Sequence, residues 1–125
     1  MENNELVLSS LGKTWIFDLD GTLVKHNGYL EGQDILLTRA ADFVSKIPSE
    51  DMIVIITSRT SECREETIKF LKDKSIRYDH IIFDAPVGER ILINDRKPSG
   101  LITAFAVNTE RDVFMENKFT VDKGR

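Results

Sequence analysis

The feature that most constrains the fold is the unbroken apolar run Met52–Ile56, which is rich in β-branched residues. Such a run is typical of a parallel β-strand that is covered on both faces. Further strands are expected at Lys13–Leu19, Ile81–Phe83, Arg90–Ile93 and Thr103–Val107. Strands that alternate with helices at this spacing predict an α/β fold, a doubly wound, Rossmann-like parallel sheet with helices on both faces.

The segments between these strands supply the expected helices and loops. Apolar residues at helical spacing predict helices over Leu36–Ile47 and Glu62–Lys74. The segment Lys25–Asp34 contains two glycines and is expected to be a flap or small hairpin. The tail, Arg111–Arg125, has a mixed pattern, and its last residues, Asp122–Arg125, are predicted to be disordered.

Length and composition favour one soluble globular domain that covers residues 1–125. The net charge of −4 gives no basic footprint for nucleic acid, which makes such a partner unlikely on composition alone. The single cysteine, Cys63, excludes an internal disulfide and fits a reducing compartment. The N-terminal stretch MENNELVLSS lacks a signal-like apolar core, and no run is long enough for a membrane span. We therefore expect a cytoplasmic protein without a membrane partner.

Polar residues follow three of the expected strands. Asp18 and Asp20 end the first, Thr57 follows the second, and Asn94 and Asp95 follow a later one. Ligands bind beyond the carboxyl ends of parallel strands, so we expect these side chains to meet at one edge of the sheet. Carboxylates that lie close together repel one another unless a cation lies among them, and oxygen ligands suit Mg²⁺. The pattern predicts a magnesium site that favours a phosphate ligand.

These residue types also predict a reaction. With a metal to screen repulsion, Asp18 can attack phosphorus as a nucleophile. Asp20 can protonate the leaving oxygen and later deprotonate water. Gly21 permits a sharp turn after the strand, and the Thr57 hydroxyl can donate to a phosphoryl oxygen. A capping or turn role is the structural alternative for the two aspartates.

Three stretches carry a family resemblance. DLDGTLV resembles the first motif of the haloacid dehalogenase superfamily of phosphohydrolases, in its DxDGT form. IITSR and LINDRKP resemble the second and fourth motifs, so the resemblance covers about Thr14–Val107. It implies an Mg²⁺-dependent phosphatase in which Asp18 forms an aspartyl-phosphate and binds the metal. Asp20 would be the acid/base, with its backbone carbonyl on the metal, and Thr57 would hold the phosphoryl group.

The resemblance implies further site residues and one departure. Asp95 would be the third metal ligand, and Asn94, also predicted at the metal site, replaces the first acid of the family's paired-acid version of the motif. The third motif supplies a cation, sometimes as a Lys-Pro pair, but the matching place here reads Ala85-Pro86. The candidate replacements are Arg90 and Lys97, with Lys72 and Lys74 as further options. The predicted phosphate- and substrate-binding residues are Gly21, Thr57, Ser58 and Arg59. An exposed salt bridge is an equal alternative for Arg59, and a structural role is the alternative for Ser58.

The intervals between the motifs are too short for the cap domain of larger family members. Capless members resemble two groups: those that act on large substrates, and those that form a homo-oligomer to cover the site. The chain resembles small members associated with capsule or surface-polysaccharide synthesis, which puts a small sugar phosphate first. NDRKP also resembles the DDR run in the phosphatase module of polynucleotide kinases, which makes a nucleotide or polynucleotide end the alternative. A catalytically weak phospho-ligand-binding module and a phosphotransferase or mutase are the rival classes.

Overall fold

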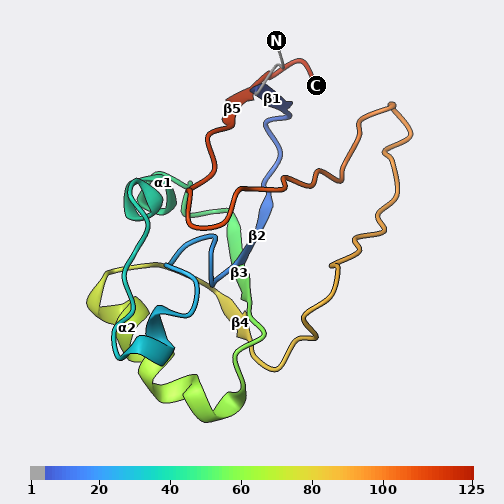
Figure 1. Cartoon of the computed structure of the whole chain (residues 1–125). Coiled ribbons are helices and arrows are strands. Elements are labelled where there is room, and N and C mark those ends of the chain that lie inside the picture. Colours follow the sequence, from blue (N-terminus) through green and yellow to red (C-terminus); the bar gives the residue numbers. More distant parts are fainter. Residues whose placement is uncertain (1–4) are drawn as a thin grey trace. The chain divides into compact units, whose positions relative to one another are not determined.

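The computed structural model describes residues 5–125 (Figure 1). The first four residues of MENNELVLSS therefore lie outside the described residues. Contacts divide the chain into two compact units, and each is described by itself. Unit 2 comprises Gly12–Val87 and Thr109–Phe114; unit 1 comprises the residues up to Leu11, with Gly88–Asn108 and Met115–Arg125. The prediction of one domain over residues 1–125 stays a prediction.

Unit 2 is built on a parallel sheet of three strands in the order β2-β3-β4. Strand β2 (Thr14–Asp18) pairs with β3 (Met52–Ile56), which pairs with β4 (His80–Ile82). The three corresponding sequence predictions are confirmed within one or two residues. Between the strands lie α1 (Ala40–Ser45), the 3₁₀-helix η2 (Ser61–Cys63) and α2 (Arg64–Asp73). The predicted α/β class with parallel strands, compatible with a Rossmann-like fold, is confirmed.

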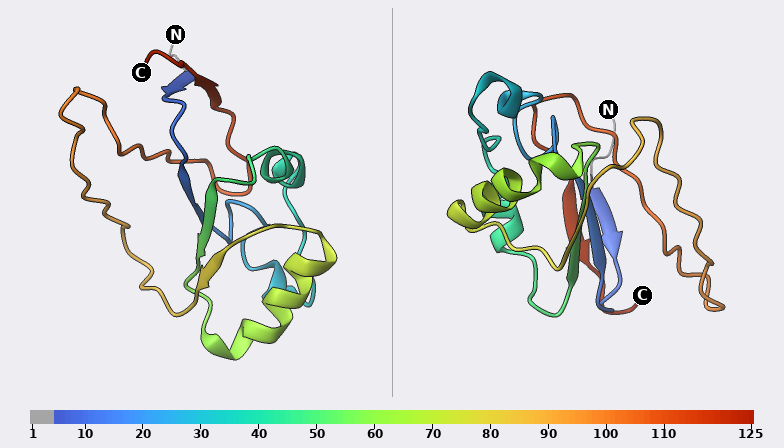
Figure 2. Two further views of the ribbon diagram at one scale, coloured as in Figure 1. Left: turned by 180° about the vertical axis from the view of Figure 1, so that it is seen from behind. Right: turned by 90° about the horizontal axis from the view of Figure 1, so that it is seen from below.

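The two helices α1 and α2 lie on the same side of this sheet (Figure 2, right). Sequential strand order with right-handed crossovers moves each connection in the same direction and therefore over the same face. Phe17, Ile53 and Ile55 are buried on that face, and the ring of Phe43 from α1 contacts Phe17 edge-on at 6.4 Å between centroids. Ile16, on the opposite face, is 52% exposed. Within the described part of unit 2, helices thus cover one face of the sheet rather than the two we expected.

The first predicted helix is shorter than its apolar pattern. The pattern runs over Leu36–Ile47, whereas α1 begins at Ala40. Leu36 forms an isolated antiparallel bridge with Val24, so this part of the chain is extended. Arg39, at the N-cap, has a φ of 76°, which a helix does not continue. The flap contains the 3₁₀-helix η1 (Gly28–Glu31).

Unit 1 differs most from the sequence predictions. Strand β1 (Glu5–Leu8) pairs in parallel with β5 (Lys118–Val121), which lies in the tail predicted as mixed. The strands predicted at Arg90–Ile93 and Thr103–Val107 are wrong, because the described residues there form no strand. A strand needs a second strand to form hydrogen bonds with its backbone N–H and C=O groups. An apolar pattern of side chains does not show whether such a partner is present. The end of the chain, predicted to be disordered, contains a turn in which the Arg125 N–H donates to the Asp122 carbonyl oxygen (3.1 Å).

None of the helices formed by residues 5–125 has the length and apolar character that crossing a membrane requires.

Candidate active site

The two aspartates of the DLDGTLV stretch lie where β2 ends. Asp18 is the last residue of β2, and the next residue, Leu19, is only 1% exposed. The Leu19 carbonyl oxygen accepts three backbone N–H groups from the turn that follows, those of Thr22 (3.2 Å), Leu23 (2.9 Å) and Val24 (3.1 Å). This buried, hydrogen-bonded residue between the two aspartates fixes the backbone that carries them.

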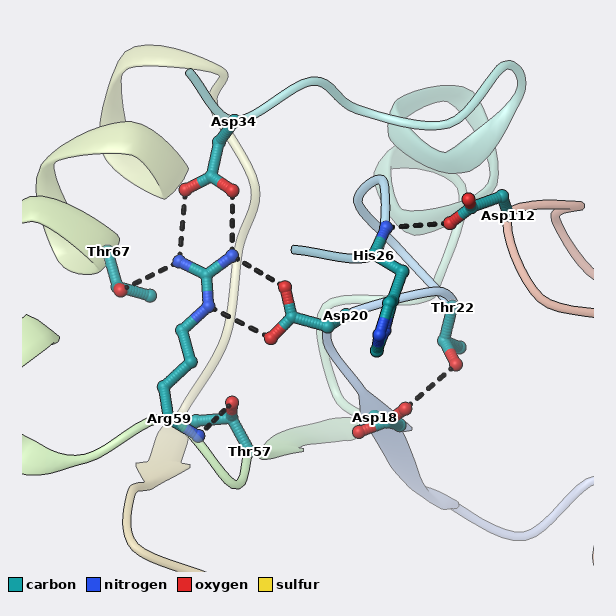
Figure 3. Close-up of polar contacts among 9 residues, drawn as sticks. All are labelled: Asp18, Asp20, Thr22, His26, Asp34, Thr57, Arg59, Thr67 and Asp112. Atoms are coloured by element: carbon teal, nitrogen blue, oxygen red, sulfur yellow. Dashed lines mark hydrogen bonds and ion pairs between the residues drawn. The ribbon is translucent and has the colours of Figure 1, made fainter. Parts of the chain in front are cut away.

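Gly21 makes the turn possible. Its φ is 82°, in the left-handed region that side chains with a Cβ disfavour. Its carbonyl oxygen accepts the backbone N–H of Asp112 (2.9 Å). The Asp112 carboxylate in turn accepts the backbone N–H of His26 (2.6 Å). Residues 109–114, which belong to unit 2, therefore stabilise the turn through hydrogen bonds to its backbone (Figure 3).

Asp18 is half-buried and has a hydroxyl neighbour. The Thr22 hydroxyl donates to Asp18 Oδ2 at 3.1 Å (Figure 3). In the β2–β3 register, Asp18 pairs with Ile56, so that Thr57 follows at the same edge of the sheet. The structure thus brings together the ends of β2 and β3, as the topology of a parallel sheet predicts.

Thr57 and Ser58 form the turn after β3. Thr57 is 1% exposed, and its Oγ1 accepts the backbone N–H of Arg59 (3.0 Å). Its own N–H donates to the carbonyl oxygen of Ile82, at the end of β4 (2.9 Å). The Ser58 hydroxyl donates to the Pro86 carbonyl oxygen (3.3 Å). These bonds tie the turn to β4 and to the chain that follows it.

Arg59 is the most heavily bonded side chain of the site. Its side chain is 1% exposed, and all five of its N–H groups have acceptors (Figure 3). Nε and Nη2 donate to the two carboxylate oxygens of Asp20, at 3.0 and 2.8 Å. Nη1 and Nη2 donate to the two oxygens of Asp34, at 3.0 and 2.7 Å. The remaining Nη1 N–H donates to Thr67 Oγ1, on α2, at 3.0 Å.

The flap adds an aromatic ring to this cluster. The centroid of the Tyr29 ring lies 4.0 Å from Cζ of Arg59, a cation–π distance. Burial alone would lower the pKa of Arg59, but hydrogen bonds and attraction from Asp20 and Asp34 outweigh it and raise that pKa above its ordinary value. Burial, together with the negative charge of Asp20, raises the pKa of Tyr29. The cation of the cluster and the neutral phenol are therefore both stable at neutral pH.

Sequence reasoning identified Asp20 and Arg59 but missed three of their neighbours: Asp34, Thr67 and the ring of Tyr29 over the guanidinium. The sequence offers only a weak signal for Asp34. It is an acidic residue at the end of the flap, and Arg59, a possible partner, follows β3. The salt-bridge alternative for Arg59 describes what the structure contains, with the difference that the ion pairs are buried. Every N–H group of the Arg59 side chain already has an acceptor in this structure, so none remains for the predicted contact with substrate.

The remaining predicted residues lie elsewhere. Lys72 and Lys74 are at the end of α2, and the following Asp79 N–H donates to Ile53, at the start of β3. These lysines therefore lie toward the edge of the sheet opposite Asp18, and the structure does not bring them to the site. Four predicted residues belong to unit 1, which is described by itself: Arg90, Asn94, Asp95 and Lys97.

The Asn94–Asp95 pair has local contacts within unit 1. The Asn94 amide donates to Thr103 Oγ1 at 2.8 Å. The Thr103 hydroxyl donates to the backbone carbonyl oxygen of Asp95. Both residues are exposed within a segment without strands. The role of Asp95 as a metal ligand and that of Asn94 beside it stay predictions.

The donor chemistry in unit 2 suits a hard cation only in part. Among residues 5–125, no three or more His, Cys, Asp or Glu side chains cluster in a way that could hold a metal ion. Both carboxylate oxygens of Asp20 are engaged by Arg59, so that of the two motif aspartates only Asp18 has a carboxylate that the guanidinium does not hold. Oxygen donors fit Mg²⁺ in kind, but a complete shell needs more of them. An Mg²⁺ ion at this edge would therefore need further oxygen ligands.

Comparison with known proteins gives a partial match. No family model and no curated protein matches the chain. Among solved structures, a chain of the Pnkp1/Rnl/Hen1 complex is 29% identical over 66% of this chain and 31% of that chain, with a TM-score of 0.51. A chain of the Pnkp1/Rnl/Hen1 RNA repair complex is 31% identical over 65% of this chain and 28% of that chain, with a TM-score of 0.52. The chain thus spans less than a third of the length of either, and is similar to part of an RNA repair complex.

Proposed function

We propose that this chain is an Mg²⁺-dependent phosphomonoester hydrolase of the haloacid dehalogenase type, with Asp18 as its nucleophile. The observation that carries the proposal is the placement of Asp18 at the end of β2, beside Thr57 at the end of β3. Ligands of parallel α/β sheets bind at this edge. The rigid turn around Leu19 supports it, because a nucleophile needs a fixed approach to the reacting atom.

The proposed reaction has two steps. In the first, a carboxylate oxygen of Asp18 forms a bond to phosphorus, the ester P–O bond breaks, and Asp20 gives a proton to the leaving oxygen. In the second, a water oxygen bonds to phosphorus, the bond between phosphorus and the Asp18 oxygen breaks, Asp20 accepts the proton of the water, and inorganic phosphate leaves. The Thr57 hydroxyl donates to a phosphoryl oxygen. Mg²⁺, held by Asp18, the Asp20 carbonyl and Asp95, would offset the negative charge of nucleophile and phosphate.

We propose a nucleotide or polynucleotide end as the substrate class. The similarity to a chain of an RNA repair complex supports it, as does the resemblance of NDRKP to the polynucleotide kinase phosphatase module. A small sugar phosphate, our first expectation from the sequence, is the second candidate. The net charge of −4 favours it, because a long phosphate backbone is held mainly by lysine and arginine.

The test is phosphate release with Mg²⁺ from three kinds of ester: a 3′-phosphorylated oligoribonucleotide, nucleoside monophosphates and hexose phosphates. Asp18→Asn is expected to reduce release by about a thousandfold or more, because the amide is a poor nucleophile. Asp42→Asn is the matched control, since Asp42 is exposed and its ion pair with Lys46, the residue that follows α1, is a contact of little energetic weight. Full activity in Asp18→Asn would contradict the proposal.

The same panel distinguishes the rival classes. Binding of a phosphorylated ligand without turnover of any ester would favour a phospho-ligand-binding module. Transfer to an added sugar acceptor that is faster than hydrolysis would favour a mutase. Sedimentation with and without substrate tests whether a second copy covers the open site.

A further inference from the structure

We propose that Arg59 and Asp34 are positioning residues for Asp20: Asp34, at the end of the flap, fixes the guanidinium, and the guanidinium fixes both oxygens of the acid/base. This inference rests on the proposed function, because it assigns a task to a cluster beside Asp18. It concerns Asp34, a residue that the motifs do not include, and it gives Arg59 a role other than contact with substrate.

One nitrogen atom joins the two carboxylates. Nη2 of Arg59 donates to Asp20 Oδ1 at 2.8 Å and to Asp34 Oδ1 at 2.7 Å. The planar guanidinium presents its N–H groups in a rigid fork, so each carboxylate that it binds on two atoms is oriented as well as held. Asp34 bonds two donors on one side of the fork and Asp20 two on the other. A shift of either carboxylate therefore turns the group that holds the other.

Burial makes this coupling strong. The side chains of Arg59, Asp34 and Asp20 are 1%, 9% and 16% exposed. Two carboxylates and one guanidinium form a cluster with one excess negative charge, shielded from most of the solvent. Removing one partner of a buried ion pair leaves an uncompensated charge, whereas a surface pair loses little. Water cannot readily replace Asp34 as the partner that orients the guanidinium.

The cluster also joins four separate segments of unit 2. Asp20 comes from the turn after β2, Asp34 from the end of the flap and Arg59 from the turn after β3. Thr67 comes from α2 and takes the fifth N–H group. The flap supplies a second contact through Tyr29, whose ring lies over the guanidinium. The position of the flap and the orientation of Asp20 are therefore mechanically linked.

The link predicts a specific kinetic signature. Orientation of Asp20 matters in the first step only when the leaving oxygen needs a proton. An alkoxide, such as the ribose oxygen of a 3′-phosphorylated oligoribonucleotide, needs that proton. p-Nitrophenolate is a stable anion and leaves without it. A positioning defect at Asp20 therefore slows the first substrate and spares the second, whereas a general loss of structure slows both.

The experiment compares these two substrates, with Mg²⁺, in the wild-type chain and in Asp34→Asn, which keeps the shape of the side chain and removes its charge. We expect kcat/KM, which reports only the steps up to release of the leaving group, to fall about tenfold for the oligoribonucleotide, within the range of general acid catalysis, and to stay within about twofold for p-nitrophenyl phosphate. Asp42→Asn is the control and should change neither. Equal effects on both substrates, or no effect on either, would overturn the inference while leaving the hydrolase proposal in place.

A wild-type chain that releases phosphate from neither substrate, nor from the nucleoside monophosphates and hexose phosphates, would instead refute the proposed function, and the positioning role of Asp34 with it. A second measurement needs no turnover: urea unfolding of Asp20→Asn, Asp34→Asn and the double variant. We expect the double variant to lose more stability than the two single variants combined, because only it leaves the buried guanidinium without a carboxylate. Additive losses would overturn the claim that the two carboxylates share Arg59.

Discussion

The segments Thr14–Asp20 and Arg90–Asp95 both contain a short apolar run and end in an aspartate, but their structures differ. In unit 2 the first segment forms β2, pairs with β3 and buries Phe17 and Leu19. In unit 1 the second segment forms no strand, and Ile91 and Ile93 are 82% and 90% exposed. An apolar run therefore becomes a strand only where a second strand forms hydrogen bonds with its backbone N–H and C=O groups.

Among substitutions that contrast buried with exposed residues, the largest loss of stability is expected at Arg59. Arg59→Ala removes all five N–H donors and leaves Asp20 and Asp34 side by side without a cation. We expect the free energy of unfolding to fall by about 3–5 kcal/mol, the usual loss for breaking a buried ion pair. Urea unfolding monitored by circular dichroism measures it.

A matched control on an exposed ion pair shows what burial contributes. Lys46→Ala breaks the contact with Asp42 on α1, in which both side chains are largely exposed. The expected loss is below about 1 kcal/mol. Similar losses for Arg59→Ala and Lys46→Ala would contradict a buried cluster.

A pair of core and surface substitutions tests the comparison directly. Leu19→Ala removes a side chain that is 1% exposed and is expected to cost about 3 kcal/mol, from lost burial and the cavity left behind. Ile93→Ala, at a residue that is 90% exposed, is expected to change stability by no more than about 0.5 kcal/mol. The readout is the urea midpoint of each variant. A loss at Ile93 as large as that at Leu19 would mean that residues 88–108 are packed in solution.

The smallest expected effect is a pH dependence. The pKa of Tyr29 is raised by burial and by Asp20, with smaller increases from Cys63 and Asp34, and Arg59 partly offsets the rise. A phenol whose pKa is higher in the folded than in the unfolded chain stabilises the fold below its ordinary pKa, and this contribution is lost as the pH rises through the folded value. Stability should therefore decline slightly at strongly alkaline pH, and less in Tyr29→Phe.

Ultraviolet absorbance of the tyrosinate measures the same group. The chain has two tyrosines, so the titration is recorded in a Tyr78→Phe background to isolate Tyr29. Ionisation at or below the ordinary pH for a tyrosine would show that the ring does not lie in this partly buried setting beside Asp20.

The predictable part of the fold was the part whose partners are close in sequence. The strands at 14–18, 52–56 and 80–82 follow from apolar runs separated by helical segments, because each strand pairs with the next along the chain. The pairing of β1 with β5 joins the two ends of the described chain, and neither four-residue strand has a distinctive pattern. Such long-range pairing depends on tertiary contacts that no local window of sequence contains.

The candidate site divides in the same way. Asp18, Asp20 and Thr57 were predictable because strand ends in a parallel sheet share an edge. Asp34 was not, because its partner Arg59 lies on another loop, and no periodicity relates the two. The start of α1 was misplaced because Leu36 pairs with Val24, a tertiary contact that overrides helical spacing. These features depend on burial, hydrogen bonds and ion pairs between distant segments, which the local sequence pattern does not contain.

The measurement that tests the central claim most directly is trapping of the phosphorylated enzyme. The chain is mixed with Mg²⁺ and an oligoribonucleotide that carries a ³²P-labelled 3′-phosphate, quenched in acid, and its peptides are separated. We expect label on the peptide that contains Asp18, sensitive to hydroxylamine as an acyl phosphate is, and none in Asp18→Asn. Release of phosphate by Asp18→Asn at the wild-type rate, or label on another residue, would contradict Asp18 as the nucleophile.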